Sequence, residues 1–299
     1  MGYSPIALFV YNRPEHTRQT IEALINNIGA ECSDLYIYSD APKTDKDRVL
    51  VDTVRKIIKE THGFNKIEII EGESNQGLSK SIIDGVTSLC EKYGKVIVVE
   101  DDLITSKLFL DFMNKALDKY ENNDSVMHVS GYMFPIEPYS SESFFLPLTS
   151  SWGWGTWRNS WKAFEPNGVK LYERLKAAGM FYKFNINNTY NYKRMLEKQI
   201  RGGNDSWAVR WYASVFLKNG LGLFPANSHV RNIGLDNSGV HCSATNDYDV
   251  KLLGEGTDEL PSHIEISRCM FEKLTSYYQA NHVSLLKKIF NRLKKMWLS

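Results

Sequence analysis

Short apolar runs alternate with amphipathic helical patterns over the first half of this 299-residue chain. An alternation of this kind predicts an α/β fold with a mostly parallel, Rossmann-like sheet flanked by helices. Beyond Met127 the pattern changes to turn-rich and aromatic-rich sequence, which predicts a partly antiparallel extension built against the first half. The expected strands cover residues 6–11, 35–39, 67–70 and 96–99, and the expected helices cover 14–27, 44–61 and 78–89.

The balance of charge and the spacing of cysteines argue against several classes of function. The chain carries 36 basic and 35 acidic residues, so no overall positive field favours nucleic acid as a partner. Its four cysteines form no C-x-x-C pair, which argues against a structural zinc or a redox motif. The sequence has no basic, cleavable leader and no apolar run long enough to span a bilayer. We therefore expect a cytoplasmic protein with reduced thiols.

Three consecutive acids, Glu100, Asp101 and Asp102, follow the apolar run at 96–99. A β-branched run is typical of a strand buried on both faces, so the acids lie where that strand leaves the sheet, the edge at which open α/β sheets bind ligands. Adjacent carboxylates repel each other unless a cation neutralises them, and oxygen ligands favour Mg²⁺ or Mn²⁺ over zinc. The triplet predicts a metal site that holds a phosphorylated ligand. The alternative is that Asp101 and Asp102 cap a helix that starts near Ser106.

Polar residues also follow the other expected strands, and we expect them to converge at the same sheet edge. The sequence Y-N-R-P follows the first strand, where a dinucleotide-binding domain would have G-x-G-x-x-G, and the chain has no G-x-x-x-x-G-K-[ST]. Rossmann dehydrogenases and P-loop NTPases are therefore disfavoured. Taken singly, the polar residues after the second and third strands are also typical of turns. The candidates at this edge are Tyr11, Asn12, Arg13, Asp40, Asn75, Gly77 and Lys80.

These stretches resemble the metal-dependent glycosyltransferases of the GT-A fold. The resemblance rests on F-V-Y-N-R-P at 9–14, Y-S-D at 38–40, N-Q-G-L-S-K at 75–80 and V-V-E-D-D-L at 98–103. The E-D-D form of the family's D-x-D motif is most similar to the group that includes N-acetylglucosaminyltransferase I. Three motifs in the second half of the chain resemble a bacterial branch associated with surface polysaccharides. They are S-S-W-G-W-G-T-W at 150–157, D-S-W-A-V-R-W at 205–211 and N-I-G-L-D-N-S-G-V-H-C at 232–242.

The resemblance implies a nucleotide-sugar donor, with UDP favoured, and a role for each residue of the donor half. Asp40 would contact the nucleotide base, Asn12 and Arg13 would line its pocket, and Lys80 would reach the base or the phosphates. Tyr11, Asn75 and Gly77 belong to the same nucleotide-sugar-binding set.

The resemblance also implies how the acidic triplet works. Glu100 and Asp101 would face the nucleotide sugar, and Asp102 would bind Mn²⁺ or Mg²⁺ directly. Many members supply another ligand from a later loop, for which His241 is the candidate. The alternative for His241 is a polar histidine in a loop.

Asp205 is the candidate base for an inverting transfer, which needs a carboxylate to take the proton from the attacking hydroxyl. It follows Gly202-Gly203-Asn204 and leads into a helical segment. Because aspartate in that position is also typical of a helix N-cap, both roles are open.

Six of the seven tryptophans fall between residues 152 and 211, the region expected to face a saccharide acceptor. Indole rings stack on the apolar C–H faces of sugars, and glycine lets a backbone approach closely. The acceptor-binding candidates are Trp152, Gly153, Trp154 and Trp207. Ordinary core packing is the alternative, which we favour for Trp157 and Trp161.

The expected organisation is a nucleotide-sugar-binding half at 1–130, an acceptor-binding half of the same domain at 131–260 and a C-terminal helical segment at 261–299. Residues 283–297 read as a basic amphipathic helix. Such a helix would lie on the inner face of the cell membrane, through residues 282–299, if the acceptor is lipid-linked. The alternative is a helix packed against its own domain or a partner.

The predicted activity is transfer of a hexosyl or N-acetylhexosaminyl group from a nucleotide sugar to a saccharide acceptor in cell-surface polysaccharide synthesis. A sugar nucleotidyltransferase should carry a glycine-rich, basic loop after the first strand, and Y-N-R-P is not such a loop. A catalytically silent carbohydrate- or nucleotide-binding protein has less need of the acidic triplet.

Overall fold

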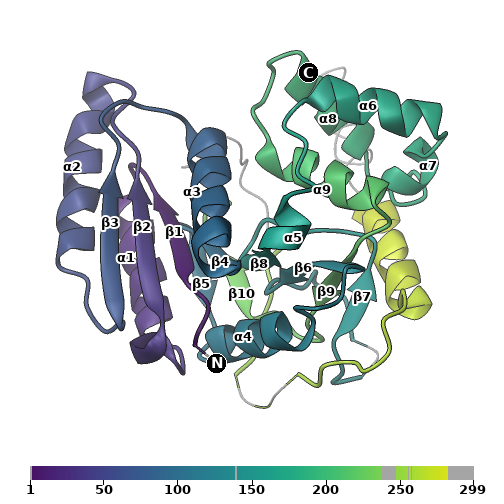
Figure 1. The fold of residues 1–299 in the computed structure, drawn as a ribbon, viewed down its shortest axis with the longest axis horizontal. Coiled ribbons are helices and arrows are strands. Elements are labelled where there is room, and N and C mark those ends of the chain that lie inside the picture. Colours follow the sequence, from purple (N-terminus) through teal and green to yellow (C-terminus); the bar gives the residue numbers. More distant parts are fainter. Residues whose placement is uncertain (1, 139, 237–246, 255, 257, 282–299) are drawn as a thin grey trace, which may run out of the picture.

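The computed structural model describes the chain except for residues 1, 139, 237–246, 255, 257 and 282–299. Within the described residues, eight strands form one sheet in the order β3-β2-β1-β4-β8-β6-β9-β7 (Figure 1). Its strands are β1 (Ile6–Val10), β2 (Asp34–Ser39), β3 (Lys66–Glu71), β4 (Lys95–Glu100), β6 (Val126–Ser130), β7 (Phe144–Leu146), β8 (Trp154–Trp157) and β9 (Leu221–Phe224). The first four run parallel, whereas β8 is antiparallel to β4 and β6, and β7 is antiparallel to β9. The predicted fold class, a mostly parallel sheet with a partly antiparallel extension, is confirmed.

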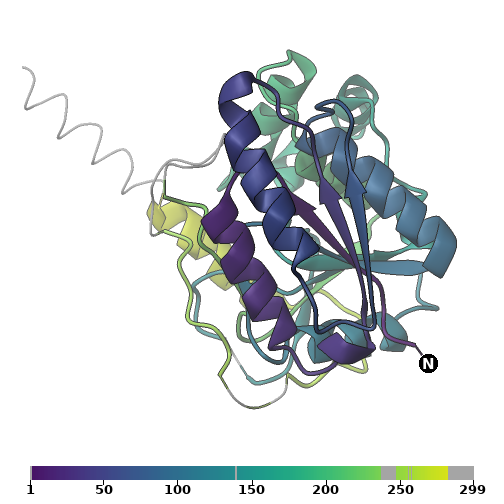
Figure 2. The same cartoon turned by 90° about the vertical axis from the view of Figure 1, so that its left-hand side faces the viewer.

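Helices cover both faces of the parallel part, because successive side chains of a strand point to opposite faces. On β1, Ile6 and Leu8 pack with apolar residues of α1, α2 and α4, whereas Ala7 and Phe9 pack with α3 and α9. Figure 2 shows α1 and α2 on one side of the strands and α3 on the other. The helices are α1 (Pro14–Ile25), η1 (Ala30–Cys32), α2 (Asp45–Lys59), α3 (Leu78–Tyr93), α4 (Phe109–Lys119), α5 (Arg158–Trp161), α6 (Gly168–Ala177), α7 (Phe181–Phe184), α8 (Tyr192–Ile200) and α9 (Trp207–Leu217), followed by a helix over residues 268–281.

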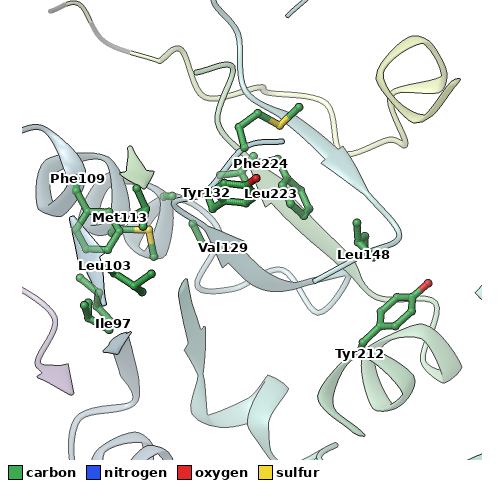
Figure 3. Close-up of a cluster of buried hydrophobic side chains, with 14 of the residues drawn as sticks. Ile97, Leu103, Phe109, Met113, Val129, Tyr132, Leu148, Tyr212, Leu223 and Phe224 are labelled. Carbon is green, nitrogen blue, oxygen red and sulfur yellow. The ribbon is translucent and has the colours of Figure 1, made fainter. Parts of the chain in front are cut away.

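The largest apolar core joins the first and second halves of the chain. Figure 3 shows part of it, where Ile97 of β4 and Met113 of α4 lie in the same cluster as Val129 of β6 and Leu223 of β9. Burial of this shared apolar surface is the main force that holds the antiparallel extension against the parallel sheet. Within the described residues, no helix combines the length and apolarity that a membrane crossing requires. The basic pattern at 283–297 lies outside the described residues.

A two-stranded ribbon that the sequence pattern did not predict follows the acidic triplet. It pairs β5 (Leu103–Thr105) with β10 (Val230–Asn232) in an antiparallel arrangement. His229 braces the ribbon: one ring nitrogen lies 2.9 Å from the Ser106 hydroxyl and the other 2.6 Å from Oδ2 of Asp258. Because all three side chains are buried, we interpret the contacts among Ser106, His229 and Asp258 as structural: they fix the segment beside the acids.

Candidate active site

The acidic triplet lies where the order of the strands reverses. The chain passes from β1 outward through β2 to β3, and α3 then returns it to β4 on the other side of β1. Ligands of open α/β sheets bind outside the carboxyl ends of the strands at such a reversal. Phe9 pairs with Glu100 in the register of these two strands. The residues that follow β1 therefore lie beside the acidic triplet.

Groups that follow β1 hold the acidic turn in place. The backbone N–H of Tyr11 donates to Oδ2 of Asp101 across 3.3 Å. The guanidinium of Arg13 lies 2.8 Å from Oδ2 of Asp102 and 3.9 Å from Oδ1 of Asp101. The hydroxyl of Thr20 donates to the Asp101 carbonyl across 2.8 Å. These contacts bring two of the residues singled out after the first strand together with the triplet.

The helix-cap alternative for the two aspartates is wrong. The next helix, α4, begins at Phe109, and its N-cap residue Leu108 makes no side-chain cap. The strand β5 intervenes between the acids and this helix. Asp101 and Asp102 therefore occupy a turn between two strands rather than a helix start.

Burial and mutual repulsion disfavour the charged form of two of the three acids. The pKa of Asp101 rises from its ordinary value of 3.8 to about 7, chiefly because the carboxyl is buried and also because Asp102 lies beside it; Arg13 opposes this rise. The pKa of Glu100 is likewise raised well above 4.5 by burial and then by the two neighbouring aspartates. The turn thus gathers three carboxyl groups whose full ionisation Arg13 only partly compensates, and a bound cation would favour the ionised forms.

We expect the raised pKa of Asp101 to make the stability of the protein depend on pH. Because the folded Asp101 holds its proton to a higher pH than the unfolded chain does, unfolding releases protons between about pH 4 and 7, and the free energy of unfolding falls as the pH rises through that window. The shift corresponds to at most about 4 kcal/mol. Asp101→Asn, which resembles the protonated acid, should be more stable than wild type at pH 8 and similar to it at pH 4 in metal-free thermal denaturation. Parallel pH profiles for the two proteins would contradict this.

Two residues that the sequence analysis did not single out join Arg13. Asp236 lies 3.6 Å from the guanidinium through Oδ1 and 3.2 Å from Nε2 of His16 through Oδ2. The segment after β10 brings Asp236 here, because the backbone N–H of Ile233 donates to the Asp102 carbonyl across 2.8 Å. Asp236 belongs to the motif at 232–242, so its sequence neighbourhood was a signal. Its pairing with His16 depends on the tertiary fold.

Gly234 leaves room for the Asp102 carboxylate. A Cβ at this position would lie 2.1 Å from Oδ2 of Asp102 and 2.8 Å from the guanidinium of Arg13. We predict that the Gly234→Ala variant folds and that its methyl group displaces this ion pair. Its affinity for a nucleotide in the presence of Mn²⁺ should be lower than that of wild type by about tenfold or more. The matched control is Gly254→Ala, since nothing lies within 4 Å of a Cβ there. The measurement is a nucleotide titration with Mn²⁺, read by thermal shift. Equal affinities of the two variants would show that Gly234 is not needed to position Asp102.

The donor atoms of the turn fit Mg²⁺ or Mn²⁺. Among the described residues, no three His, Cys, Asp or Glu side chains form a group that could hold a metal by itself. Mg²⁺ usually keeps several waters and is held by one or two carboxylates together with substrate phosphates, so a complete protein cage is not required. Asp102 is the carboxylate that would hold the ion, with Asp101 beside it.

Asp40 organises the loop that follows β3. Its Oδ2 accepts the backbone N–H of Gly77 at 2.8 Å, and its two carboxylate oxygens lie 3.0 and 3.1 Å from the N–H of Gln76. The Asn75 amide donates to the Ala41 carbonyl across 2.7 Å. The carboxyl end of β2 and the loop after β3 are therefore locked together, which brings three more of the predicted residues to one side of the sheet.

The remaining donor-side residues make local contacts. The Asn12 amide donates to Asp47 across 2.8 Å, and the Tyr11 hydroxyl accepts the backbone N–H of Lys43 at 2.9 Å, so the start of α2 is tied to the end of β1. Lys80 pairs with Asp84 one turn further along α3. The roles of these residues toward a nucleotide stay predictions.

Asp205 is exposed, and it is held by a buried arginine. Its side chain is 68% exposed, and Oδ1 accepts from Nη2 of Arg210 at 3.0 Å. The same guanidinium nitrogen donates to the hydroxyl of Ser79, in the first turn of α3, across 2.5 Å. The N-cap of α9 is Ser206, whose side chain accepts from Val209, so the N-cap alternative for Asp205 is wrong. Arg210 ties the Asp205 loop to the helix that begins after the Asp40-bound loop.

The tryptophans divide between core and surface in a way that revises the prediction. Trp154 is fully buried, stacks on Trp207 with ring centroids 5.0 Å apart and leaves its Nε1 without a partner among the described residues. Trp207 is also buried, so neither indole presents a face to a saccharide. Trp157 and Trp161 are buried, as favoured from the sequence.

Trp152 is partly exposed and lies edge-on to Tyr132 and Tyr248, so of the three candidate tryptophans it is the one that stays available for acceptor contact. Gly153, with φ of 60°, forms the turn between Trp152 and β8, and a Cβ there would lie 2.6 Å from a methyl of Val230. The predicted metal ligand His241 lies outside the described residues.

No protein-family model and no curated protein matches the chain. Several solved structures are similar to it. A mannosyltransferase from Pyrobaculum calidifontis in complex with GDP-Man and Mn²⁺ is 16% identical over 58% of this chain and 47% of its own, with a TM-score of 0.37. TarS from S. aureus, as residues 1–349, is 11% identical over 76% of this chain and 59% of its own, with a TM-score of 0.42.

A third structure, glucosyl-3-phosphoglycerate synthase from Mycobacterium tuberculosis in complex with Mn²⁺, UDP and glucosyl-3-phosphoglycerate, is 10% identical over 59% of this chain and 67% of its own, with a TM-score of 0.34. The chain spans about half the length of the first two structures. At these identities and TM-scores the likeness assigns neither a family nor an activity to this chain.

Proposed function

We propose that this chain is a metal-dependent glycosyltransferase. It moves a hexosyl or N-acetylhexosaminyl group from a nucleotide sugar, UDP-linked, to a saccharide acceptor in the synthesis of cell-surface polysaccharide. Transfer proceeds with inversion, and Asp205 is the base. The observation that carries the proposal is the placement of the acidic triplet and Arg13 at the point where the strand order reverses.

The donor site is supported by the chemistry at the ends of the parallel strands. A nucleoside diphosphate needs positive charge for its phosphates and polar groups for its base. The guanidinium of Arg13 lies beside the acidic turn, and the Asp40-bound loop lies two strands away. Asp102 would hold a divalent ion, which when bound would supply positive charge to offset the charge that develops on a departing diphosphate.

The acceptor side is supported by Asp205. Its exposed carboxylate is able to take a proton from an attacking hydroxyl, which a single inverting displacement requires. Arg210 orients the carboxylate while also contacting Ser79, so the acceptor-side loop is coupled to the donor-side helix. Trp152 offers a partly exposed ring on which a sugar would stack.

The proposal extends to a lipid-linked acceptor reached from the cytoplasmic face of the membrane. The support is the pattern of residues 283–297, in which lysines and arginines alternate with apolar residues at helical spacing. Vesicle flotation of the whole chain, compared with a chain lacking residues 282–299, tests this extension. Equal flotation of the two would contradict it.

Thermal denaturation with a panel of nucleoside diphosphates and nucleotide sugars tests the donor site. A ligand that binds only the folded state at one hundred times its Kd stabilises it by about 2.7 kcal/mol. We expect a uridine nucleotide to raise the Tm by about 5 °C or more in the presence of Mn²⁺ and by much less without it. A panel that leaves the Tm of the folded protein unchanged would favour the silent binding protein instead.

A further inference from the structure

A cavity of about 640 Å³ lies beside α7 and α8, apart from the acidic turn. Its volume is within the range of small-molecule sites. The lining is mostly polar and basic, and it includes Tyr182, Asn188, Lys193, Arg194, Lys198 and Arg201. Figure 1 shows α7 and α8 at the far end of the molecule from the parallel strands β1 to β3.

Three of the basic side chains form one stripe. Arg194, Lys198 and Arg201 are spaced by four and then three residues, so they lie on the same face along α8 and just past its end. All three are exposed, and no described residue forms an ion pair with them. The fourth, Lys193, differs because it lies 3.7 Å from Glu197. Like charges at this spacing repel each other, so a bound anion would relieve the repulsion between Arg194 and Lys198.

The charge is local rather than a property of the whole surface. The chain has a net charge of only +1, whereas the cavity is lined by four basic residues and a single acid, Glu197. Among the described residues, Arg55 and Arg210 have carboxylate partners, whereas Arg174, Arg231 and Arg268 have none, so it is the gathering of four basic side chains around one cavity that sets this surface apart. This concentration of positive charge favours an anion as the ligand of the cavity.

The end of the cavity nearest α7 is held in a fixed shape. Ile186, Asn187 and Asn188 all have left-handed backbone, with φ of 49°, 52° and 62°. Such a turn persists only where its surroundings impose it. Here Ile186 is buried, and the side chain of Asn185 accepts the backbone N–H of Lys193 at 2.8 Å. Asn188 is thereby presented to the cavity, and Tyr182, 56% exposed, offers a ring beside it.

The other end of the cavity adjoins the loop that carries Asp205. The backbone N–H of Gly203 donates to the Lys198 carbonyl across 2.8 Å, and the Asn204 amide lies 3.3 Å from the Met195 carbonyl. The loop therefore folds back on α8. The loop begins directly after Arg201, so the basic stripe ends where the segment that carries Asp205 starts.

We propose that this cavity is a secondary acceptor subsite for an anionic saccharide chain whose phosphodiester or carboxylate groups pair with Arg194, Lys198 and Arg201. Arginine suits both groups because its planar fork donates two hydrogen bonds to either. Tyr182 stacks on a sugar ring between the charges. The inference rests on the proposed function, since it names the class of acceptor for the same enzyme.

Binding of three oligomers of similar length tests the subsite: a glycerol phosphate oligomer, an oligogalacturonate and a neutral maltooligosaccharide. We expect wild type to bind one of the anionic oligomers and not the neutral one in isothermal titration calorimetry, and the oligomer that binds identifies phosphodiester or carboxylate. Replacing Arg194→Gln and Arg201→Gln together should weaken that binding about tenfold or more. The matched control, Arg174→Gln with Lys176→Gln, removes the same charge from exposed positions of α6 and should leave binding within twofold.

Two results would overturn the inference: an equal loss of binding in both double variants, or no preference of wild type for an anionic oligomer. The Mn²⁺-dependent nucleotide shift, measured on wild type in the same buffer, separates this failure from failure of the proposed function. A nucleotide shift without oligomer binding overturns the subsite alone. Oligomer binding without a nucleotide shift leaves an anionic saccharide site on a chain that is not a transferase.

Discussion

Asp102→Asn is expected to abolish the stabilisation that a nucleotide and Mn²⁺ confer together, and to lower sugar transfer about a hundredfold or more. An ion that offsets the leaving group's charge contributes several kcal/mol to the transition state, and each 1.36 kcal/mol is about a factor of ten in rate. The neutral amide is a much weaker ligand than a carboxylate. Its oxygen still accepts from Arg13, so the Tm without nucleotide should stay close to wild type.

The measurement is a Mn²⁺ titration at saturating nucleotide, read by thermal shift and followed by an assay of product. Glu71→Gln is the matched control, because Glu71 is also a carboxylate at a strand end, 3.3 Å from Arg55 and 2.8 Å from Lys59. Loss of the Mn²⁺ effect in both variants would point to general charge rather than to a site. Full retention in Asp102→Asn would remove this residue from the metal site.

Asp205→Asn is expected to fold normally, bind the nucleotide as wild type does and lose about a hundredfold to ten-thousandfold in transfer rate, the range of general-base contributions. The asparagine oxygen can still accept from Arg210, so the loop should keep its position while the proton acceptor is lost. The defect should appear in kcat rather than in the KM of the donor.

Asp111→Asn is the control for that experiment, since Asp111 also pairs with a cation, Lys115 at 2.7 Å, but lies on α4. Transfer by the Asp111 variant should match wild type. Wild-type turnover by Asp205→Asn would show that another group takes the proton. A raised KM for acceptor with unchanged kcat would give Asp205 a binding role only.

The acidic turn and its neighbours were predictable because they follow long, strongly apolar strands. β4 is buried along five of its six residues, so its end could be placed from the pattern alone. The ends of β1 and β2 followed in the same way, because these strands are also largely buried. The ribbon of β5 and β10 was not predictable, because each strand has three residues and pairs with a segment more than 120 positions away in the chain. Asp236 was missed for the same reason.

The tryptophans show the limit of residue type as a guide. An indole is equally suited to a core and to a sugar-binding surface, and only its direction decides between them. Trp154 belongs to β8, between β4 and β6, where helices cover the sheet, so its ring packs on Trp207 of α9. Trp152 precedes the strand and keeps part of its ring exposed. Alternation along one short strand did not reveal that difference.

The α/β class, the parallel strands and the acids at the end of β4 were predictable from the amino-acid sequence, because hydrophobic periodicity and β-branched runs are local properties of the chain. Which polar side chains contact one another depends instead on the three-dimensional fold. Arg13 contacts Asp102 because β1 and β4 are neighbours, and Arg210 contacts Ser79 because α9 packs beside α3. Such pairings join residues about 90 to 130 positions apart, and they depend on the order in which strands and helices assemble around a shared core.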